Sequence, residues 1–309
     1  LGCMGMSGMY GESDEAESVA TIQMALDRGV NLIDTGDFYG VGHNELLIGR
    51  ALRGRRDQAV LSVKFGALRA PGGGWGGVDN RPAAVKNFLA YTLTRLGVDH
   101  IDIYRPARLD PAVPIEETVG ALAELVKAGY VRHIGLSEVG LETIERAQKV
   151  HPIVDLQIEY SLVSRAPEAK ILPRLAELGI ATTAYGVLSR GLLTGARPTS
   201  AQDFRAHLPR FAADNRAQNQ RLVDQLERTA QDLGVSKAQL AIAWVLNKNP
   251  RVVPVVGART RRQLEDALGA IDVPLGAGQL AALEAAVPAA AVAGTRYHEA
   301  HMQQLDSER

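Results

Sequence analysis

The chain has 309 residues, and 46% of them are hydrophobic, so it can bury a sizeable core and shows no sign of disorder. Its formal net charge is -1, with 34 basic and 35 acidic residues interspersed. This argues against a nucleic-acid or anionic-membrane surface, because such surfaces need a basic stripe. The single cysteine, Cys3, excludes an internal disulfide framework and fits a reducing cytoplasm, where we expect the protein to reside.

The two ends of the chain lead to further expectations. The first residue is Leu1 rather than methionine, so we expect that the start is trimmed and that "LGCMGMS" is an interior strand-like segment. The most apolar late stretch, "GQLAALEAAVPAAAVAG", contains Glu284 and Pro288 and is too interrupted to span a membrane. We expect a soluble protein without a signal peptide, with a C-terminal tail from about residue 288.

Short runs rich in β-branched residues alternate with longer stretches of helical spacing along the whole chain. The opening segment counts as the first expected strand. The other expected strands cover residues 31–36, 59–66, 101–107, 133–140, 154–162, 180–188 and 252–258. The expected helices lie around 15–28, at 44–54, 82–97, 114–129, 141–150 and 168–179, as a pair within 215–248, and at 260–271.

Eight strand–helix units predict a parallel sheet that is covered by helices on its outer side. The fold class is therefore α/β, and eight units over this length match a (β/α)8 TIM barrel. Since no Pro- or Ser-rich linker divides the chain, we expect a single domain over residues 1–309. A doubly wound dinucleotide fold is the alternative, but the opening glycines at 2, 5 and 8 do not follow the G-x-G-x-x-G spacing.

Polar side chains gather at the ends of the expected strands, where a barrel of this kind places its chemistry. Taken alone, Asp34 is more often a turn residue and Lys64 more often a lysine that reaches solvent. Together with Tyr39 they form a unit, in which Asp34 holds Lys64 and Lys64 lowers the pKa of the Tyr39 phenol. A phenol with a lowered pKa is a better general acid. Other polar residues at these ends are Ser137, Glu138, Gln157, Tyr185 and Arg259.

The segments "DTGDFYG", "SVKFG", "HIGLSEVG", "DLQIEYSL", "AYGVLSRGLLTG" and "VVPVVGARTRRQLEDALGA" resemble the aldo-keto reductase family in order and spacing, from Leu1 to about Arg296. The resemblance implies a (β/α)8 barrel that binds NADPH and reduces an aldehyde or ketone. It also implies that Tyr39 protonates the carbonyl oxygen, with Lys64 and Asp34 behind it. Ser137 and Gln157 then hold the nicotinamide carboxamide and Tyr185 stacks on its ring, whereas Glu138 stands where many relatives have asparagine.

The phosphate end of the cofactor has its own expected residues. The backbone around Gly191 offers N–H groups to a pyrophosphate, and Arg259 at a helix start can grip a 2'-phosphate. By the resemblance, Gln263 contacts the same phosphate and Asp266 the adenine, although Ala267 replaces a common asparagine. We expect Arg261 and Arg262 to form a solvated helix face. The cofactor-binding set also includes Gly2, Met4, Leu188, Ser189 and Gly257.

The family pattern D-x-x-x-x-H at the end of the fourth strand is incomplete here. Asp102 is in register, but Ala107 stands where the histidine belongs. Period-two alternation places Arg105 on the face of Ala107. We expect Arg105 to replace the lost polarity, with Ala107 widening the substrate pocket. The partner candidates for Arg105 are Asp34, Glu138 and Glu159. Some pyridoxal reductases of the family look similar at these positions, which suggests a ring-bearing aldehyde such as pyridoxal.

Three minor features complete the set. The segment "GGGWGG" at 72–77 resembles a lid with Trp75 as a pocket wall, and a mobile surface turn is an equally good interpretation. His298 and His301 have metal-like spacing, but we expect a solvated tail and no metal site. Cys3 is expected as a small core residue.

An alternative function, suited to the missing histidine, is an NADP(H)-binding regulatory or partner subunit. The sequence does not indicate an oligomeric state.

Overall fold

The computed structural model describes residues 1–71, 73–201 and 203–309. Its main sheet has the strand order β1-β2-β5-β6-β7-β8-β9, and each neighbouring pair is parallel. These strands are β1 (Leu32–Gly36), β2 (Val60–Phe65), β5 (Ile101–Pro106), β6 (Val131–Ser137), β7 (Ile153–Glu159), β8 (Ala181–Tyr185) and β9 (Val252–Pro254).

The opening segment closes this sheet into a barrel. Gly2 forms parallel bridges to Asp34 on one side and to Gly257 on the other. The Gly2 amide donates to the Val256 carbonyl at 2.8 Å, and the Cys3 amide donates to the Asp34 carbonyl at 3.0 Å. Residues 1–3 therefore take the eighth strand position between β9 and β1, which confirms the predicted (β/α)8 barrel. Cys3 is fully buried in the core, as expected.

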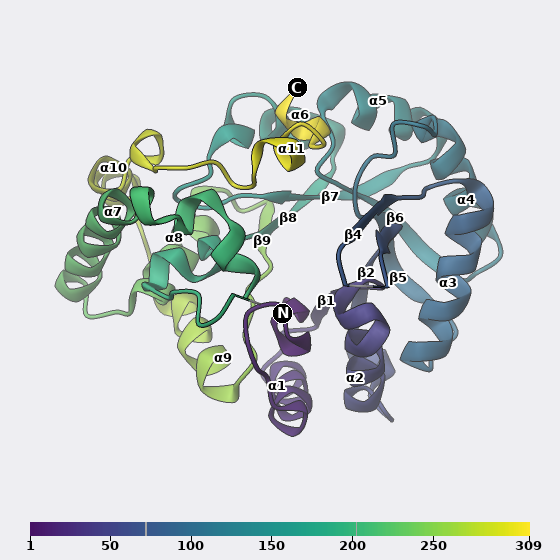
Figure 1. Cartoon of the computed structure of the whole chain (residues 1–309), viewed down its shortest axis with the longest axis horizontal. Helices are drawn as coiled ribbons and strands as arrows, with labels where there is room; N and C mark the ends of the chain where they lie inside the picture. The colour runs from purple at the N-terminus through teal and green to yellow at the C-terminus, as the bar shows by residue number, and fades with distance from the viewer. Residues whose placement is uncertain (72, 202) are drawn as a thin grey trace.

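Helices surround the strands in the order of the chain (Figure 1). Local signals set their ends: Asp14 caps α1 by accepting a hydrogen bond from the Glu17 amide at 2.7 Å, and Gly97 ends α3 with a φ of 67°. The helices are α1 (Glu15–Asp27), α2 (His43–Ala51), α3 (Pro82–Leu96), α4 (Ile115–Lys127), α5 (Leu141–Val150), α6 (Ile171–Leu178), α7 (Ala213–Asp232), α8 (Lys237–Lys248), α9 (Arg261–Leu268), α10 (Ala277–Ala286) and α11 (Glu299–Met302). None of the helices in the described ranges is long and apolar enough to cross a membrane.

Two segments are added at the carboxyl-terminal end of the strands, which we call the mouth. The antiparallel hairpin β3 (Ala67–Arg69) and β4 (Trp75–Val78) follows β2, so the predicted lid is a hairpin, although Gly72 lies outside the described residues. Residues 288–309, the C-terminal segment, run back over the mouth (yellow in Figure 1).

We expected a solvated tail around His298 and His301, and the C-terminal segment that contains them is anchored to the barrel at particular residues. The side chains of Arg296 and Leu305 are only 8% and 2% exposed. Asp306 Oδ2 accepts hydrogen bonds from the Gly140 amide and from Thr143 Oγ1, both at 2.7 Å, at the start of α5. Gly140 permits this close approach, because a Cβ there would lie 2.8 Å from the Asp306 carbonyl oxygen. Of the histidine pair, His298 is exposed and His301 is half-buried.

Candidate active site

A buried ion pair lies at the centre of the mouth. Lys64 Nζ is 2.6 Å from Asp34 Oδ1, and both side chains are 5% exposed. The second carboxylate oxygen of Asp34 accepts hydrogen bonds from Ser62 Oγ at 2.9 Å and from Gln157 Nε2 at 2.7 Å. Burial opposes the charge of Asp34, but Lys64 and the nearby Arg105 outweigh it, so the pKa of this carboxyl is lowered. The strands thus hold Asp34 as a fixed anion.

Tyr39 lies over this pair. It begins the turn Tyr39–Gly42 that follows β1, and it is 7% exposed. Lys64 Nζ is 5.2 Å from the centroid of the Tyr39 ring, and Phe38 meets the ring edge-on at a centroid distance of 4.8 Å. The structure therefore brings together the three residues that we expected to act as a unit.

The pKa of Tyr39 differs from our expectation. We predicted that Lys64 would lower the pKa of the phenol. Burial and the negative charge of Asp34 instead raise the pKa of Tyr39 well above its ordinary value, and Arg108 is the cation that opposes the rise. Lys64 is not among the main influences on this pKa, and its charge is paired with Asp34 at 2.6 Å. Tyr39 is accordingly held in the protonated form that a proton donor requires.

Arg105 has a different partner from the three acids that we considered. Its guanidinium lies 2.8 Å from Asp155 Oδ1 on β7 and donates to Ser62 Oγ at 2.8 Å and to Thr183 Oγ1 at 3.2 Å. Arg105 is 0% exposed, inside the barrel beneath the Asp34–Lys64 pair. Space for it comes from Gly135, where a Cβ would lie 3.2 Å from the guanidinium carbon. Arg105 therefore supports the site from below and does not reach a substrate.

The end of β5 carries a cation that the sequence reasoning missed. Ala107 is 2% exposed and has no side-chain donor. The next residue, Arg108, is half-buried at the mouth, where its guanidinium donates to the Ala107 carbonyl at 2.6 Å and to Tyr297 Oη at 3.5 Å. The strand ends at Pro106, so alternation no longer predicts where this side chain points.

The C-terminal segment occupies part of the region expected for the nicotinamide. Tyr185 Oη donates to Glu138 Oε1 at 2.7 Å and lies 3.2 Å from Tyr297 Oη. Burial raises the pKa of Tyr297, but Arg190 and Arg108 outweigh it and lower the pKa. Ser137 and Gln157 lie opposite each other in the register of β6 and β7.

The loop after β8 has the conformation of a tight turn. Ser189, Arg190 and Gly191 have φ values of 46°, 56° and 91°. Gly191 is required there, since a Cβ would lie 2.9 Å from the Ala196 Cβ. Its N–H, which we expected to offer to a pyrophosphate, donates to the Leu188 carbonyl at 2.9 Å. Arg190 turns inward and lies 2.8 Å from Glu159 Oε2.

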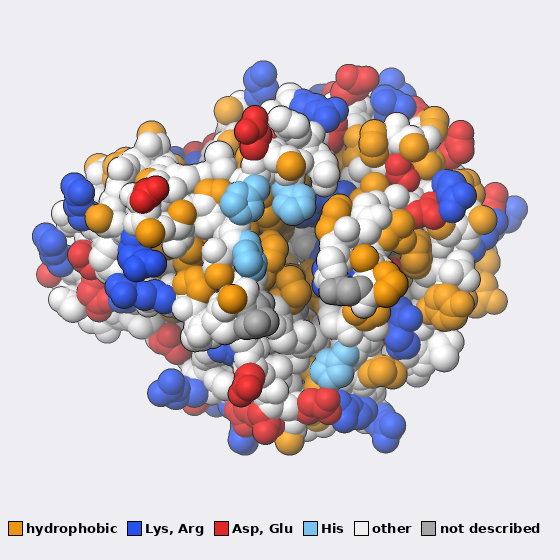
Figure 2. Space-filling view, viewed as in Figure 1, with side chains coloured by type: hydrophobic (Ala, Val, Ile, Leu, Met, Phe, Trp, Pro, Cys, Tyr) orange, Lys and Arg blue, Asp and Glu red, His pale blue; other side chains and the backbone are white. Residues whose placement is uncertain are grey.

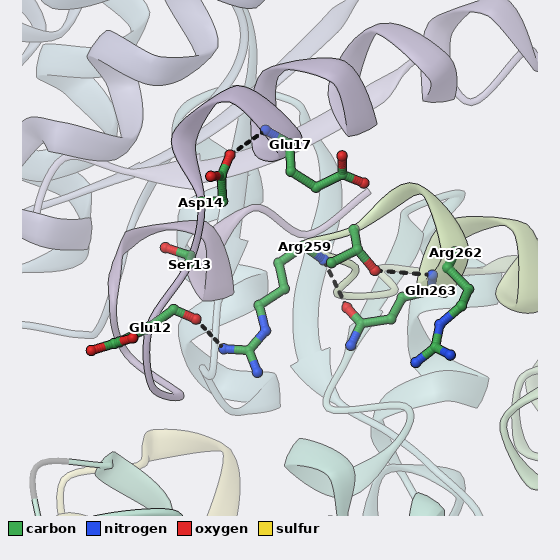
Figure 3. A pocket seen from close by; sticks show the side chains of 8 residues that line it. Glu12, Ser13, Asp14, Glu17, Arg259, Arg262 and Gln263 are labelled. Carbon is green, nitrogen blue, oxygen red and sulfur yellow. Dashed lines mark hydrogen bonds between the residues drawn. The ribbon is translucent and has the colours of Figure 1, made fainter.

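A cavity of about 390 Å³ lies between the start of α1 and the start of α9. Figure 3 shows Arg259 extending from the α9 side toward the loop of Glu12, and its guanidinium donates to the carbonyls of Tyr10 and Glu12, each at 3.0 Å. The Gln263 side chain accepts from the Arg259 amide at 3.0 Å. The cavity is lined by Glu12, Ser13, Asp14, Glu17, Arg259, Thr260, Arg262 and Gln263.

The lining of this cavity carries both signs of charge. Arg259, Arg262 and the first turn of α9 contribute cationic groups and backbone amides, whereas Glu12, Asp14 and Glu17 contribute carboxylates. Arg262, which we expected on a solvated face, belongs to the wall, whereas Arg261 is bound to Glu17 at 2.8 Å. Met4 begins a short 3-10 helix (Met4–Ser7), and Asp266 lies further along α9, outside the lining of the cavity.

The face that carries the mouth is hollowed at its centre, with histidine side chains on the rim (Figure 2). Trp75, 40% exposed on β4, meets the His301 ring edge-on at a centroid distance of 6.3 Å. The hairpin and the C-terminal segment therefore touch across the mouth. Among the described residues, no group of three or more His, Cys, Asp or Glu side chains is arranged to hold a metal ion.

Comparison with known proteins places this arrangement in a family. A sequence profile described as the Aldo/keto reductase family matches residues 1–288. "Probable aldo-keto reductase 1" of Glycine max is 39% identical over 96% of this chain and 87% of its own length. "Aldo-keto reductase yakc [NADP(+)]" of Schizosaccharomyces pombe is 37% identical, with 96% and 90% covered.

Solved structures agree with the sequence relatives. The glycerol dehydrogenase of Gluconobacter oxydans has a TM-score of 0.83 and 32% identity, covering 93% of this chain and 90% of its own. An aldo/keto reductase of Klebsiella pneumoniae in complex with NADP and acetate has a TM-score of 0.75 and 25% identity, with 99% and 94% covered.

Proposed function

The chain belongs to the aldo/keto reductase family, and on that basis we propose that it reduces aldehydes or ketones to alcohols with NADPH as the reductant. The observation that carries the proposal is the buried Asp34–Lys64 pair beneath Tyr39. A partly hidden phenol over a fixed ion pair serves proton transfer, whereas a surface that only binds a nucleotide has no use for it.

NADPH, when bound, supplies the two electrons and the hydrogen that reduce the carbonyl carbon. We assign its 2'-phosphate to Arg259, Arg262 and Gln263, because these residues line the cavity at the start of α9. Asp266 is assigned to the adenine and Gly191, with Leu188 and Ser189, to the pyrophosphate. At the nicotinamide end we assign Ser137, Gln157 and Tyr185, next to the backbone of Gly2, Met4 and Gly257.

Tyr39 is the proton donor in this proposal. Its high pKa keeps the phenol protonated until a much stronger base, the oxygen of the reduced carbonyl, forms beside it. Asp34 holds Lys64 in place 5.2 Å from the centre of the Tyr39 ring, and Arg108 is the cation that stabilises the phenolate that remains after transfer. Trp75 on the hairpin is the proposed wall of the substrate pocket, with Ala107 leaving room at the end of β5.

A second candidate function is an NADP(H)-binding regulatory or partner subunit, and the missing histidine at position 107 favours it. The two functions make opposite predictions for turnover. The test is an NADPH-oxidation screen over short aldehydes, aromatic aldehydes, α-dicarbonyls and pyridoxal, beside a direct NADPH-binding titration. The reductase proposal predicts turnover of at least one class, with ring-bearing aldehydes such as pyridoxal among the substrates. Binding of NADPH without oxidation in all four classes supports the regulatory function instead.

A further inference from the structure

We propose that Arg108 takes the place of the absent histidine and donates a hydrogen bond to the carbonyl oxygen of the substrate beside Tyr39. The inference rests on the proposed reductase function. It assigns the oxygen-binding role to a residue that follows Ala107 rather than to Arg105.

The position of Arg108 is the first support. The residue lies at the mouth, directly after the end of β5, where the family pattern has its histidine. Two of its contacts are to neutral oxygens, the Ala107 carbonyl at 2.6 Å and Tyr297 Oη at 3.5 Å. A guanidinium has five N–H donors, so these contacts leave donors for a further oxygen.

The lack of an acidic partner is the second support. Four other cations at the mouth or directly beneath it are matched with carboxylates: Lys64 with Asp34, Arg105 with Asp155, Arg190 with Glu159, and Arg296 with Glu138. For Arg108, no carboxylate oxygen in the described ranges lies within 4.0 Å of the guanidinium. A half-buried cation without a counter-ion is suited to an oxygen on which negative charge develops during the reaction.

The surroundings fix Arg108 in place. Tyr297, which accepts its hydrogen bond, is itself held between Tyr185 Oη at 3.2 Å and the Arg190 guanidinium, 4.6 Å from the ring centroid. Arg108 is also the cation that acts on the phenol of Tyr39 and lowers its pKa against the effect of burial. The charge of Arg108 therefore reaches the proton donor from the end of β5.

The chemistry balances without a further reagent. The carbonyl carbon accepts two electrons and a hydrogen from NADPH, the C=O π bond becomes the oxygen lone pair, and Tyr39 Oη gives its proton to that oxygen. The phenolate then recovers a proton from water. Arg108 stays protonated throughout and stabilises first the developing charge on the oxygen and then the phenolate.

The test uses the full chain with an aldehyde that the wild type reduces. Arg108→Ala is expected to lower kcat by about 10²–10³-fold, the usual cost of one oxyanion donor, with the Kd for NADPH unchanged. Added guanidinium ion is expected to restore part of the lost rate. The basic limb of the kcat–pH profile is expected to move to higher pH, because the cation that lowers the Tyr39 pKa is gone. Arg132→Ala is the matched control, because it removes an exposed arginine near the start of β6, at the end of the strand away from the mouth.

Arg108→Gln keeps a donor without the charge and serves if the alanine variant does not fold; it is expected to shift the basic limb in the same direction. An unchanged kcat and pH profile in both variants overturns the inference and leaves the reductase proposal intact. The inference is also overturned if KM rises only for aldehydes that carry a carboxylate while kcat is unchanged. That result would show that Arg108 binds the carboxylate of the substrate and not its carbonyl oxygen. Failure of the wild type to oxidise NADPH with any carbonyl overturns the proposed function itself, together with this inference.

Discussion

The Glu138 carboxylate binds the Arg296 guanidinium through two hydrogen bonds, of 2.9 and 3.0 Å, and this pair ties the C-terminal segment to the end of β6. Ser307 Oγ adds a third hydrogen bond at 2.6 Å. Glu138 is fully buried and has a φ of 52°, a left-handed conformation that non-glycine residues seldom adopt. Burial opposes its charge, but Arg296 outweighs it and lowers the pKa of this carboxyl. The acid that replaces the family asparagine thus has a structural role that the sequence did not reveal.

Arg296→Ala is expected to loosen the C-terminal segment, because it leaves the Glu138 carboxylate buried without its main partner. Breaking a buried pair costs about 3–5 kcal/mol of unfolding free energy, measured in urea. Limited proteolysis should then cut within residues 288–309 well before the barrel. Arg146→Ala removes an exposed arginine that binds Glu116, and it should leave both measurements nearly unchanged. Equal behaviour of the two variants would show that the segment is not held by this pair.

Arg105→Leu is expected to destabilise the barrel by about 3–5 kcal/mol, because the Asp155 carboxylate remains inside without a counter-ion. The double variant Arg105→Leu/Asp155→Leu removes both charges and should recover much of that loss in the same urea titration. If the double variant is as unstable as the sum of the two single variants, the two residues do not form the pair described here.

Asp37 gives the protein a pH-dependent stability. Burial, together with the charge of Glu45, raises the pKa of Asp37 to about 7. The folded state therefore binds this proton more tightly than the unfolded state, whose carboxyl titrates near pH 4. The resulting stability is complete below about pH 4 and is lost as the pH rises to about 7.

The variant Asp37→Asn does not titrate, so its stability relative to wild type should grow by up to about 4 kcal/mol between pH 4 and pH 8. Thermal unfolding of both proteins at these two values measures the change. A difference in Tm that stays constant, or that shrinks toward pH 8, contradicts the raised pKa.

Arg259→Ala is expected to weaken NADPH binding by about 10–150-fold, the cost of about 1.5–3 kcal/mol for lost hydrogen bonds to a charged group. NADH lacks the 2'-phosphate, so its affinity should not change, and the preference for NADPH should fall by the same factor. Fluorescence titration with both nucleotides gives the two Kd values. Arg132→Ala is the control, since Arg132 is exposed at the start of β6 and does not line the cavity; a similar loss in this variant would point to a general effect of charge.

The barrel and its central cluster were predictable because their signals are local in the sequence. Asp34 lies near the end of the strand at 31–36, and Lys64 lies near the end of the strand at 59–66. Because the strands are parallel, both residues reach the mouth. The proposed cofactor role of Arg259 follows from its place at a helix start, and that of Gln263 from the family resemblance. The opening segment was also expected to be a strand from its composition, although Gly2 pairs with residues that lie far apart in the chain.

The remaining features depend on contacts that alternation cannot specify. Periodicity places Arg105 inside the barrel, but it does not choose among the acids there, and Asp155 lies 50 positions further along the chain. The pKa of Tyr39 depends on its burial and on the charges of Asp34 and Arg108, which only the folded chain brings near it. The docking of Arg296 and Tyr297 requires the mouth to exist first, so a short tail sequence gives no hint of it.

The central claim is that Tyr39 gives its proton to the substrate oxygen, and Tyr39→Phe tests it most directly. Single-turnover oxidation of bound NADPH by an aldehyde that the wild type reduces should be slower by about 10²–10⁴-fold in the variant, while the Kd for NADPH stays the same. Oxidation at the wild-type rate by a variant that binds NADPH normally would contradict the claim.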